Sequence, residues 1–366
     1  DGGERAGQPD DDAPRVWTVA ELDAVPGAEV DAWNARHRRW SRPGVAESPG
    51  RRYRVETVCG LATLRAVAGD AEDQHARLAA WFGEDPFVER QGVVRVSPDY
   101  RDFEGEGQPF WWAAGFQSGD LTSMIARFAN RAALARTLTH ELTHRFDQEL
   151  LPGLPAWLVE GRATYTETGS VAIDSLRVRE EVTAWQRLWE TGANGYGGAA
   201  GLRKVLRGEV DDYRHNYDAG YALFAFLRRF RGFDAAQAGP DVFRPRLDAY
   251  LRSFAAKPRT EAVARFEEHF CDGRDGRPAS FDEAAAHWQR FVHEGGTGAV
   301  PHAPWKATWQ ERALAAWAEE MGDAVDAPIF DRPTYRPSRN RHDRPDHGQY
   351  HALEAARLLA ADGREV

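Results

Sequence analysis

The sequence predicts an α+β protein in which a small sheet-bearing part packs on a mostly helical part that follows it. Residues 51–57 and 92–98 show the alternation and the β-branched content of strands. From about residue 130 onward, apolar residues recur every three or four positions, which is the period of helices packed on a core. A chain of 366 residues is long enough to hold both parts.

The composition excludes two classes of partner. Hydrophobic residues make up 42% of the chain and charged residues 28%, which is typical of soluble globular proteins. No run of about 18 apolar residues occurs, so no membrane span is expected. The formal net charge is -10 and no Lys/Arg-rich stripe is present, which argues against nucleic acid as a partner.

The N-terminal segment and the cysteines bear on the compartment. The segment DGGERAGQPDDD is polar and acidic, as a tether behind a removed signal peptide would be. Secretion or a periplasmic location is therefore expected, with the cytoplasm left open. Cys59 and Cys271 are the only cysteines, too few for a Cys-based zinc site. One disulfide and two free thiols both remain open.

The N-terminal part consists of a tail, strands and one long helix. Residues 1–45 mix Pro, Gly and charge with little period, so a tail leading into short helical pieces is expected there. Residues 61–82 have a helical apolar stripe, and Gly83 offers its C-terminal stop. Strands are expected at residues 51–57, 92–98 and 121–128.

The helical part starts at about residue 130. Leu134, Leu138, Leu142 and Phe146 recur every four residues and predict one buried stripe. LPGLP then interrupts the chain, and Pro155 is placed to open a helix over 156–168. Further helices are expected at 178–190, 201–208, 217–230, 246–256, 260–270, 280–294, 309–320 and 348–361. The predicted division is a tail (1–45), an α/β subdomain with an edge strand (46–130), a helical subdomain (131–296) and a C-terminal extension (297–366).

The stretch THELTH places His140, Glu141 and His144 in the order HExxH. Histidines four residues apart on a helix lie one above the other, so both imidazoles can point at one metal ion. Glu141 follows a ligand directly and is placed to act as a base toward a water molecule. The pattern is short, and two solvated surface histidines are the alternative.

A catalytic zinc site takes three protein ligands and leaves one position for water, so the HExxH pattern requires a third ligand. WLVEGRATY supplies Glu160, which lies among the apolar residues that open its helix. An unpaired carboxylate is costly to bury there, and a metal ion would remove that cost. A solvent-facing glutamate is the alternative.

HELTH followed by WLVEGRATY resembles the gluzincin metallopeptidases, the peptidase MA-like clan that includes thermolysin and the aminopeptidase N relatives. Members combine HExxH with WLxEGxAxY after a spacer. The resemblance covers about residues 50–295. It implies a zincin-like fold with Zn²⁺ held by His140, His144 and Glu160, with Glu141 as general base, and a peptide or protein substrate. The spacer of 15 residues between His144 and Glu160 is shorter than is usual in the aminopeptidase branch.

A second segment, NYDAGYALFAFL, is similar to the YEKGxALLxxL helix of aminopeptidase-type gluzincins, whose leading tyrosine stabilises the oxyanion. The resemblance assigns that role to Tyr217. A phenol O–H that reaches the carbonyl oxygen would stabilise the charge that develops there. Tyr221, four residues on, is the reserve candidate, and a purely core tyrosine is the alternative.

Ligand imidazoles usually donate their second N–H to a carboxylate or a carbonyl. Asp147 lies three residues after His144, and Glu167 lies seven after Glu160. Both are candidates to orient the ligands, with plain surface acids as the alternative.

The sequence departs from the gluzincin aminopeptidases at the segment that recognises the substrate's amino terminus. Aminopeptidases of the clan carry a Gly-x-Met-Glu-Asn strand before HExxH whose glutamate binds the substrate's free amine. The corresponding stretch here, AGFQSGDLTSMIAR, has no glutamate. An endopeptidase is therefore expected, with backbone groups of this edge strand holding the peptide. A non-catalytic protein- or glycan-binding module on a retained peptidase fold and a zinc hydrolase of a non-peptide substrate are the alternatives.

Overall fold

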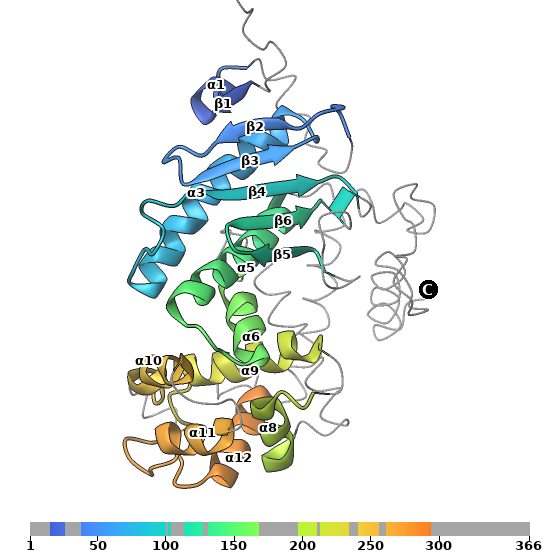
Figure 1. The fold of residues 1–366 in the computed structure, drawn as a ribbon. Coiled ribbons are helices and arrows are strands. Elements are labelled where there is room, and N and C mark those ends of the chain that lie inside the picture. Colours follow the sequence, from blue (N-terminus) through green and yellow to red (C-terminus); the bar gives the residue numbers. More distant parts are fainter. Residues whose placement is uncertain are drawn as a thin grey trace, which may run out of the picture.

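The computed structural model describes residues 15–25, 38–99, 102–103, 113–126, 131–167, 197–210, 213–233, 241–255 and 261–293. The architecture over these ranges is α+β, as predicted. Figure 1 shows the sheet at one end of the described part and helices α8, α11 and α12 at the other, with α6, α9 and α10 between them.

A six-stranded mixed sheet forms the N-terminal part, in the order β1-β2-β3-β4-β6-β5. Its strands are β1 (Val16–Thr18), β2 (Gly44–Glu47), β3 (Tyr53–Thr57), β4 (Gly92–Ser97), β5 (Gly115–Ser118) and β6 (Leu121–Ile125). The β2–β3 and β5–β6 pairs are antiparallel, and the other neighbours are parallel. The strand expected at 121–128 is confirmed as β6, and β5 lies beyond it at the edge of the sheet.

The two faces of the sheet differ in polarity. Side chains in β3 and β4 alternate between buried and half-buried, which is the period of a sheet with one covered face. Tyr53 and Val55 lie on the covered face and are fully buried. On the other face, Glu56 and Arg95 are cross-strand neighbours and form an ion pair at 3.0 Å. This face therefore carries charges that are paired across the strands.

Helices α3 (Leu61–Phe82) and α5 (Arg131–Leu150) pack against the strands on the covered face, and the short α1 (Val19–Asp23) packs on α3. The predicted end of α3 is confirmed, because Gly83 adopts a left-handed conformation with φ of 77°. The predicted stripe of α5 is buried in the same cluster as the sheet residues. It comprises Leu134, Leu138, Leu142 and Phe146.

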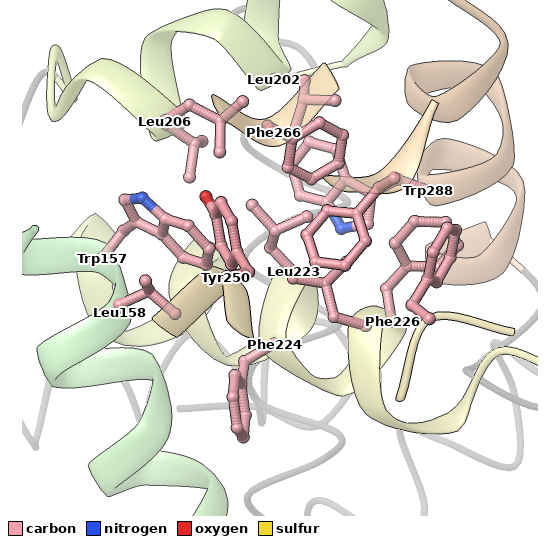
Figure 2. Close-up of a cluster of buried hydrophobic side chains, with 14 of the residues drawn as sticks. Trp157, Leu158, Leu202, Leu206, Leu223, Phe224, Phe226, Tyr250, Phe266 and Trp288 are labelled. Carbon is pink, nitrogen blue, oxygen red and sulfur yellow. The ribbon is translucent and has the colours of Figure 1, made fainter. Parts of the chain in front are cut away.

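A second core holds the helical part together. Its elements are α6 (Ala156–Glu167), α8 (Gly198–Arg207), α9 (His215–Arg229), α10 (Arg244–Arg252), the 3-10 turn η2 (Ser253–Ala255), α11 (Ala262–Phe270) and α12 (Phe281–His293). Helix α9 lies at the centre, and its residues 221–227 are all fully buried. Figure 2 shows the cluster, in which α9 residues meet Trp157 and Leu158 of α6, Leu202 of α8, Phe266 of α11 and Trp288 of α12.

Two glycines allow α6 and α9 to approach closely. A Cβ at Gly161 would lie 2.2 Å from the carbonyl carbon of Gly220, and a Cβ at Gly220 would lie 2.1 Å from the oxygen of Trp157. Both obstacles are backbone atoms, which cannot rotate away as a side chain can. Glycine is therefore required on both sides of this contact.

Replacing Gly220 with Ala is expected to lower the free energy of unfolding by about 1–3 kcal/mol or more, because the added methyl group forces the two helices apart. Denaturant titration measures the change. Gly69→Ala on α3 is the matched control, since nothing lies within 4 Å of a Cβ at Gly69. That control should stabilise the protein by about 0.4–1 kcal/mol. Equal stability of the Gly220 variant and the unmodified protein would contradict the close contact.

The structure differs from the sequence expectations at the N-terminus. Within the expected tail, Val16–Thr18 forms β1, which pairs in parallel with β2, and Thr18 caps α1 through a capping box with Glu21. A three-residue strand is too short to show a two-residue period, so the sequence carried little signal for it.

One expected boundary separates the sheet-bearing subdomain from the helical subdomain. The boundary expected at residue 131 falls before α5, whose buried stripe packs with the sheet rather than with the second core. The four-part division of the chain stays a prediction. The helices expected at 178–190, 309–320 and 348–361, and with them the C-terminal extension, lie outside the described residues.

The structure also bears on the state of the two cysteines and on the expectation of no membrane span. Cys59 is buried and Cys271 is partly buried, and both are free thiols. Among the described helices, none combines the length and the apolar character needed to cross a bilayer.

Candidate metal centre

Helices α5, α6 and α9 meet near the place where α5 packs on the edge strand β5. Helix α5 carries His140, Glu141 and His144, and the next helix, α6, carries Glu160. The histidines are separated by one helical turn, and their rings lie 4.6 Å apart at 89°. The leucines of α5 face the sheet core, so core packing and the histidine pair use different sides of the helix.

The three predicted ligands lie together. One ligand atom from each of His140, His144 and Glu160 can be chosen so that all lie within 4.8 Å of one another. His140 Nε2 lies 3.2 Å from Glu160 Oε2, and His144 Nε2 lies 3.6 Å from the same oxygen. Two imidazoles and one carboxylate are the donor set of a catalytic zinc site with an open fourth position. This donor set fits a zinc ion.

Mutual charge determines the protonation of this cluster in the metal-free protein. Burial alone would raise the pKa of Glu160, but hydrogen bonds to His140 and His144 hold it well below its usual range. Burial would lower the pKa of His140, but the charge of Glu167 and hydrogen bonds to Glu160 and Glu167 hold it well above the usual value. In the metal-free protein Glu160 is therefore ionised and His140 is protonated, so a metal ion must displace a proton from His140 to bind there.

Glu167, one of the two residues predicted to orient a ligand, contacts His140. His140 Nδ1 hydrogen bonds to Glu167 Oε1, while Nε2 faces Glu160. Glu167 is also 3.9 Å from Arg136. A carboxylate at Nδ1 fixes the ring orientation and the tautomer that leaves Nε2 available to a metal ion.

Glu141 is buried between α5 and the edge strand. It is 5% exposed, and a Cβ at Gly115 of β5 would lie 2.7 Å from its Oε1. The glycine therefore lets the backbone of β5 pass directly beside this carboxylate. Burial raises the pKa of Glu141, against the opposing charges of His140 and His144. A raised pKa suits a carboxylate that accepts a proton and later returns it.

Asp147, the other candidate to orient a ligand, has a different partner in the structure. It forms a buried ion pair with Arg162 of α6 at 3.0 Å, and both side chains are at most 4% exposed. His144 Nδ1 has no hydrogen-bond partner among the described residues. The three-residue offset on α5 turns Asp147 toward the α6 side, and its charge is matched by the Arg162 guanidinium, which also lies over Trp81 at 4.8 Å.

Asp147→Asn is expected to lower the free energy of unfolding by about 1–3 kcal/mol, because it leaves the buried Arg162 guanidinium without a counter-charge, while burial already raises the pKa of Asp147 and so reduces the loss. Zinc content per folded chain should stay the same. Chemical denaturation and elemental analysis measure the two quantities. The double variant Asp147→Asn/Arg162→Met is the control, and it should recover much of the loss. A lower metal content in the folded single variant would show that Asp147 supports metal binding.

The two candidate tyrosines of α9 are in different surroundings. The Tyr217 ring stacks on the His140 ring, with centroids 5.6 Å apart and an angle of 17° between the planes. Burial and the charges of Glu160 and Glu141 raise the pKa of Tyr217 well above its usual value, so the phenol remains a donor. Tyr221 lies fully buried in the helical core, where its ring is 6.1 Å from that of Tyr165. Tyr217 borders the cluster of His140, His144 and Glu160, whereas Tyr221 belongs to the core.

One residue at the site was missed by sequence reasoning. The Tyr213 hydroxyl donates a hydrogen bond of 2.6 Å to Glu160 Oε1. Burial and the charge of Glu160 raise the pKa of Tyr213, which keeps its proton in place. Tyr213 lies in the turn before α9, four residues before Tyr217, where helical spacing does not define a face. Only its position beside the Tyr217 motif offered a signal.

Comparisons with known proteins add little to this geometry. No protein-family model matches the sequence, and the comparison with curated proteins finds no match either. Among solved structures, the chain is similar to a mutant of an M1 zinc metallopeptidase from Deinococcus radiodurans, with 21% sequence identity and a TM-score of 0.40. The match covers 67% of this chain and 49% of that one, so the chain spans about half the length of the matched structure.

Proposed function

We propose that the chain is a zinc-dependent hydrolase that cleaves peptide bonds. The observation that carries the proposal is the convergence of His140, His144 and Glu160 on one point, with Glu141 buried beside them. Two imidazoles and a carboxylate match the ligand set of zinc hydrolases, and Glu141 is the neighbouring base that such a site requires.

Each residue of the site would have its own role in peptide-bond hydrolysis. Zinc bound by His140, His144 and Glu160 would supply a Lewis acid that polarises the scissile carbonyl and lowers the pKa of water. Glu141 then accepts a proton from the attacking water and delivers it to the nitrogen of the leaving amine. The Tyr217 hydroxyl donates a hydrogen bond to the carbonyl oxygen as negative charge develops there.

The edge strand supports an endopeptidase. Strand β5 reads GFQS and carries no acidic residue, so it offers no carboxylate to hold a free amino terminus. Its only pairing among the described strands is with β6. A peptide that adds to the other edge of β5 would lie next to Glu141, whose carboxylate borders Gly115. Such backbone pairing suits an extended segment in the interior of a chain.

Cleavage of a mixed peptide library tests the proposal. Each peptide is supplied with a free and with an acetylated N-terminus, and the reaction is run with a chelator, without it, and after zinc is restored. Internal cuts in both forms that vanish with the chelator and return with zinc are expected. Release of single N-terminal residues from the free form alone would overturn the endopeptidase assignment. A zinc-bound protein that cuts no peptide would overturn the peptidase assignment.

A further inference from the structure

The two oxygens of the Glu160 carboxylate have different partners. Oε2 faces the Nε2 atoms of His140 and His144, at 3.2 and 3.6 Å. Oε1 accepts the hydrogen bond from the Tyr213 hydroxyl at 2.6 Å. The carboxylate is 7% exposed, so water competes little for either oxygen. Its orientation is therefore set by protein groups on both sides.

We infer that Tyr213 is a positioning residue that holds Glu160 as a ligand through one oxygen only. The inference rests on the proposed function, since it takes His140, His144 and Glu160 as the metal ligands. The Tyr213 hydroxyl occupies Oε1 and leaves Oε2 pointing to the place where both imidazoles converge.

Coordination through one oxygen matters because a carboxylate can bind a metal ion with one or with both oxygens. If Oε1 also turned to the metal, it would fill the position that a catalytic zinc site keeps for water and substrate. A hydrogen bond from a neutral donor to the outer oxygen opposes that rotation. Partners of this kind typically change metal affinity by about 10- to 100-fold when removed.

The neighbouring tyrosine has a separate place. The Tyr217 ring stacks on His140, whereas the Tyr213 ring meets Tyr217 edge to face, with centroids 6.3 Å apart. Burial raises the pKa of Tyr217, and Glu160 raises it further through its charge and a hydrogen bond, but the 2.6 Å hydrogen bond to Oε1 comes from Tyr213. Tyr213→Phe keeps the ring and removes only the hydroxyl, and Tyr217→Phe is its matched control.

The test measures zinc affinity by competition with a chelator for the unmodified protein and both variants. Tyr213→Phe is expected to bind zinc about 10- to 100-fold more weakly. Tyr217→Phe should keep its affinity within a few-fold and lose turnover instead. In the Co²⁺-substituted protein, the visible absorption should weaken in Tyr213→Phe, because a tetrahedral site gains a fifth ligand when Glu160 binds through both oxygens. The spectrum of Tyr217→Phe should stay unchanged.

Three results would overturn the inference. Equal zinc affinity and an unchanged Co²⁺ spectrum in Tyr213→Phe would show that the hydroxyl does not orient Glu160. A metal-free Tyr213→Phe protein that loses as much unfolding free energy as it loses in zinc binding would assign the tyrosine to the fold. Failure of the unmodified protein to bind stoichiometric zinc would remove the metal centre itself. That last result is seen before any variant is made, so it separates failure of the proposed function from failure of this inference.

Discussion

Glu141→Gln is expected to retain zinc and to lose turnover by about 10²- to 10⁴-fold, the range that general-base catalysis contributes. Glutamine has the shape of glutamate but cannot accept the proton from the attacking water. The carboxylate is 5% exposed and lies beside β5, so an isosteric amide fits the same space. Because burial already raises the pKa of Glu141, removing its charge should not destabilise the fold. The ratio kcat/KM and the zinc content measure the two effects.

Glu149→Gln is the matched control for this variant. Glu149 lies on the same helix, is exposed, and pairs with Arg90 at 2.7 Å on the surface. Its replacement removes one acidic group away from His140, His144 and Glu160, and kcat/KM should stay the same. A Glu141→Gln protein with full activity would exclude Glu141 as the base. A variant that loses its zinc would show instead that Glu141 supports metal binding.

Glu160→Ala is expected to abolish stoichiometric zinc binding. The substitution removes the carboxylate that faces both imidazoles and leaves two protein ligands, whereas catalytic zinc sites use three. The loss of affinity should exceed the roughly 10- to 100-fold change expected for an outer partner such as Glu167. Elemental analysis after dialysis measures the zinc content directly.

The thermal transition gives a second measure of the Glu160 variant that does not depend on activity. A ligand present at 100 times its Kd stabilises the folded state by about 2.7 kcal/mol. Adding a chelator should therefore lower the Tm of the unmodified protein and leave that of Glu160→Ala unchanged. Glu167→Gln should give an intermediate result. Zinc stoichiometry equal to that of the unmodified protein would remove Glu160 from the ligand set.

Local signals in the sequence predicted several elements well. The stripe from Leu134 to Phe146 predicted α5 and its buried side, because a period of 3.6 residues places these side chains on one face. Gly83 predicted the end of α3, because a left-handed residue ends a helix there. Both signals arise within one or two helical turns and need no partner from elsewhere in the chain.

Signals that depend on distant partners were weaker. Strand β1 is three residues long and is held by its pairing with β2, about 30 positions away, so its local pattern alone predicts a tail. The offset along α5 predicts that Asp147 lies near His144, and its charge does act on that histidine, but its ion pair at 3.0 Å is with Arg162 of α6, so a role in orienting the ligand stays a prediction. In both cases the deciding contact comes from another element, and sequence spacing does not report it.

The sequence by itself determined the chemical types at the site and their local spacing: two histidines one turn apart, a base beside the first, and a glutamate in the following helix. Helical geometry converts that spacing into one face of α5 without reference to the rest of the chain. Only the tertiary structure decided which oxygen of Glu160 faces the imidazoles, that Tyr213 occupies the other, and that β5 passes beside Glu141 at Gly115. These contacts depend on how closely α5, α6, α9 and the sheet approach one another. That approach is set by close packing between elements, above all by the backbone contact of Gly161 with Gly220.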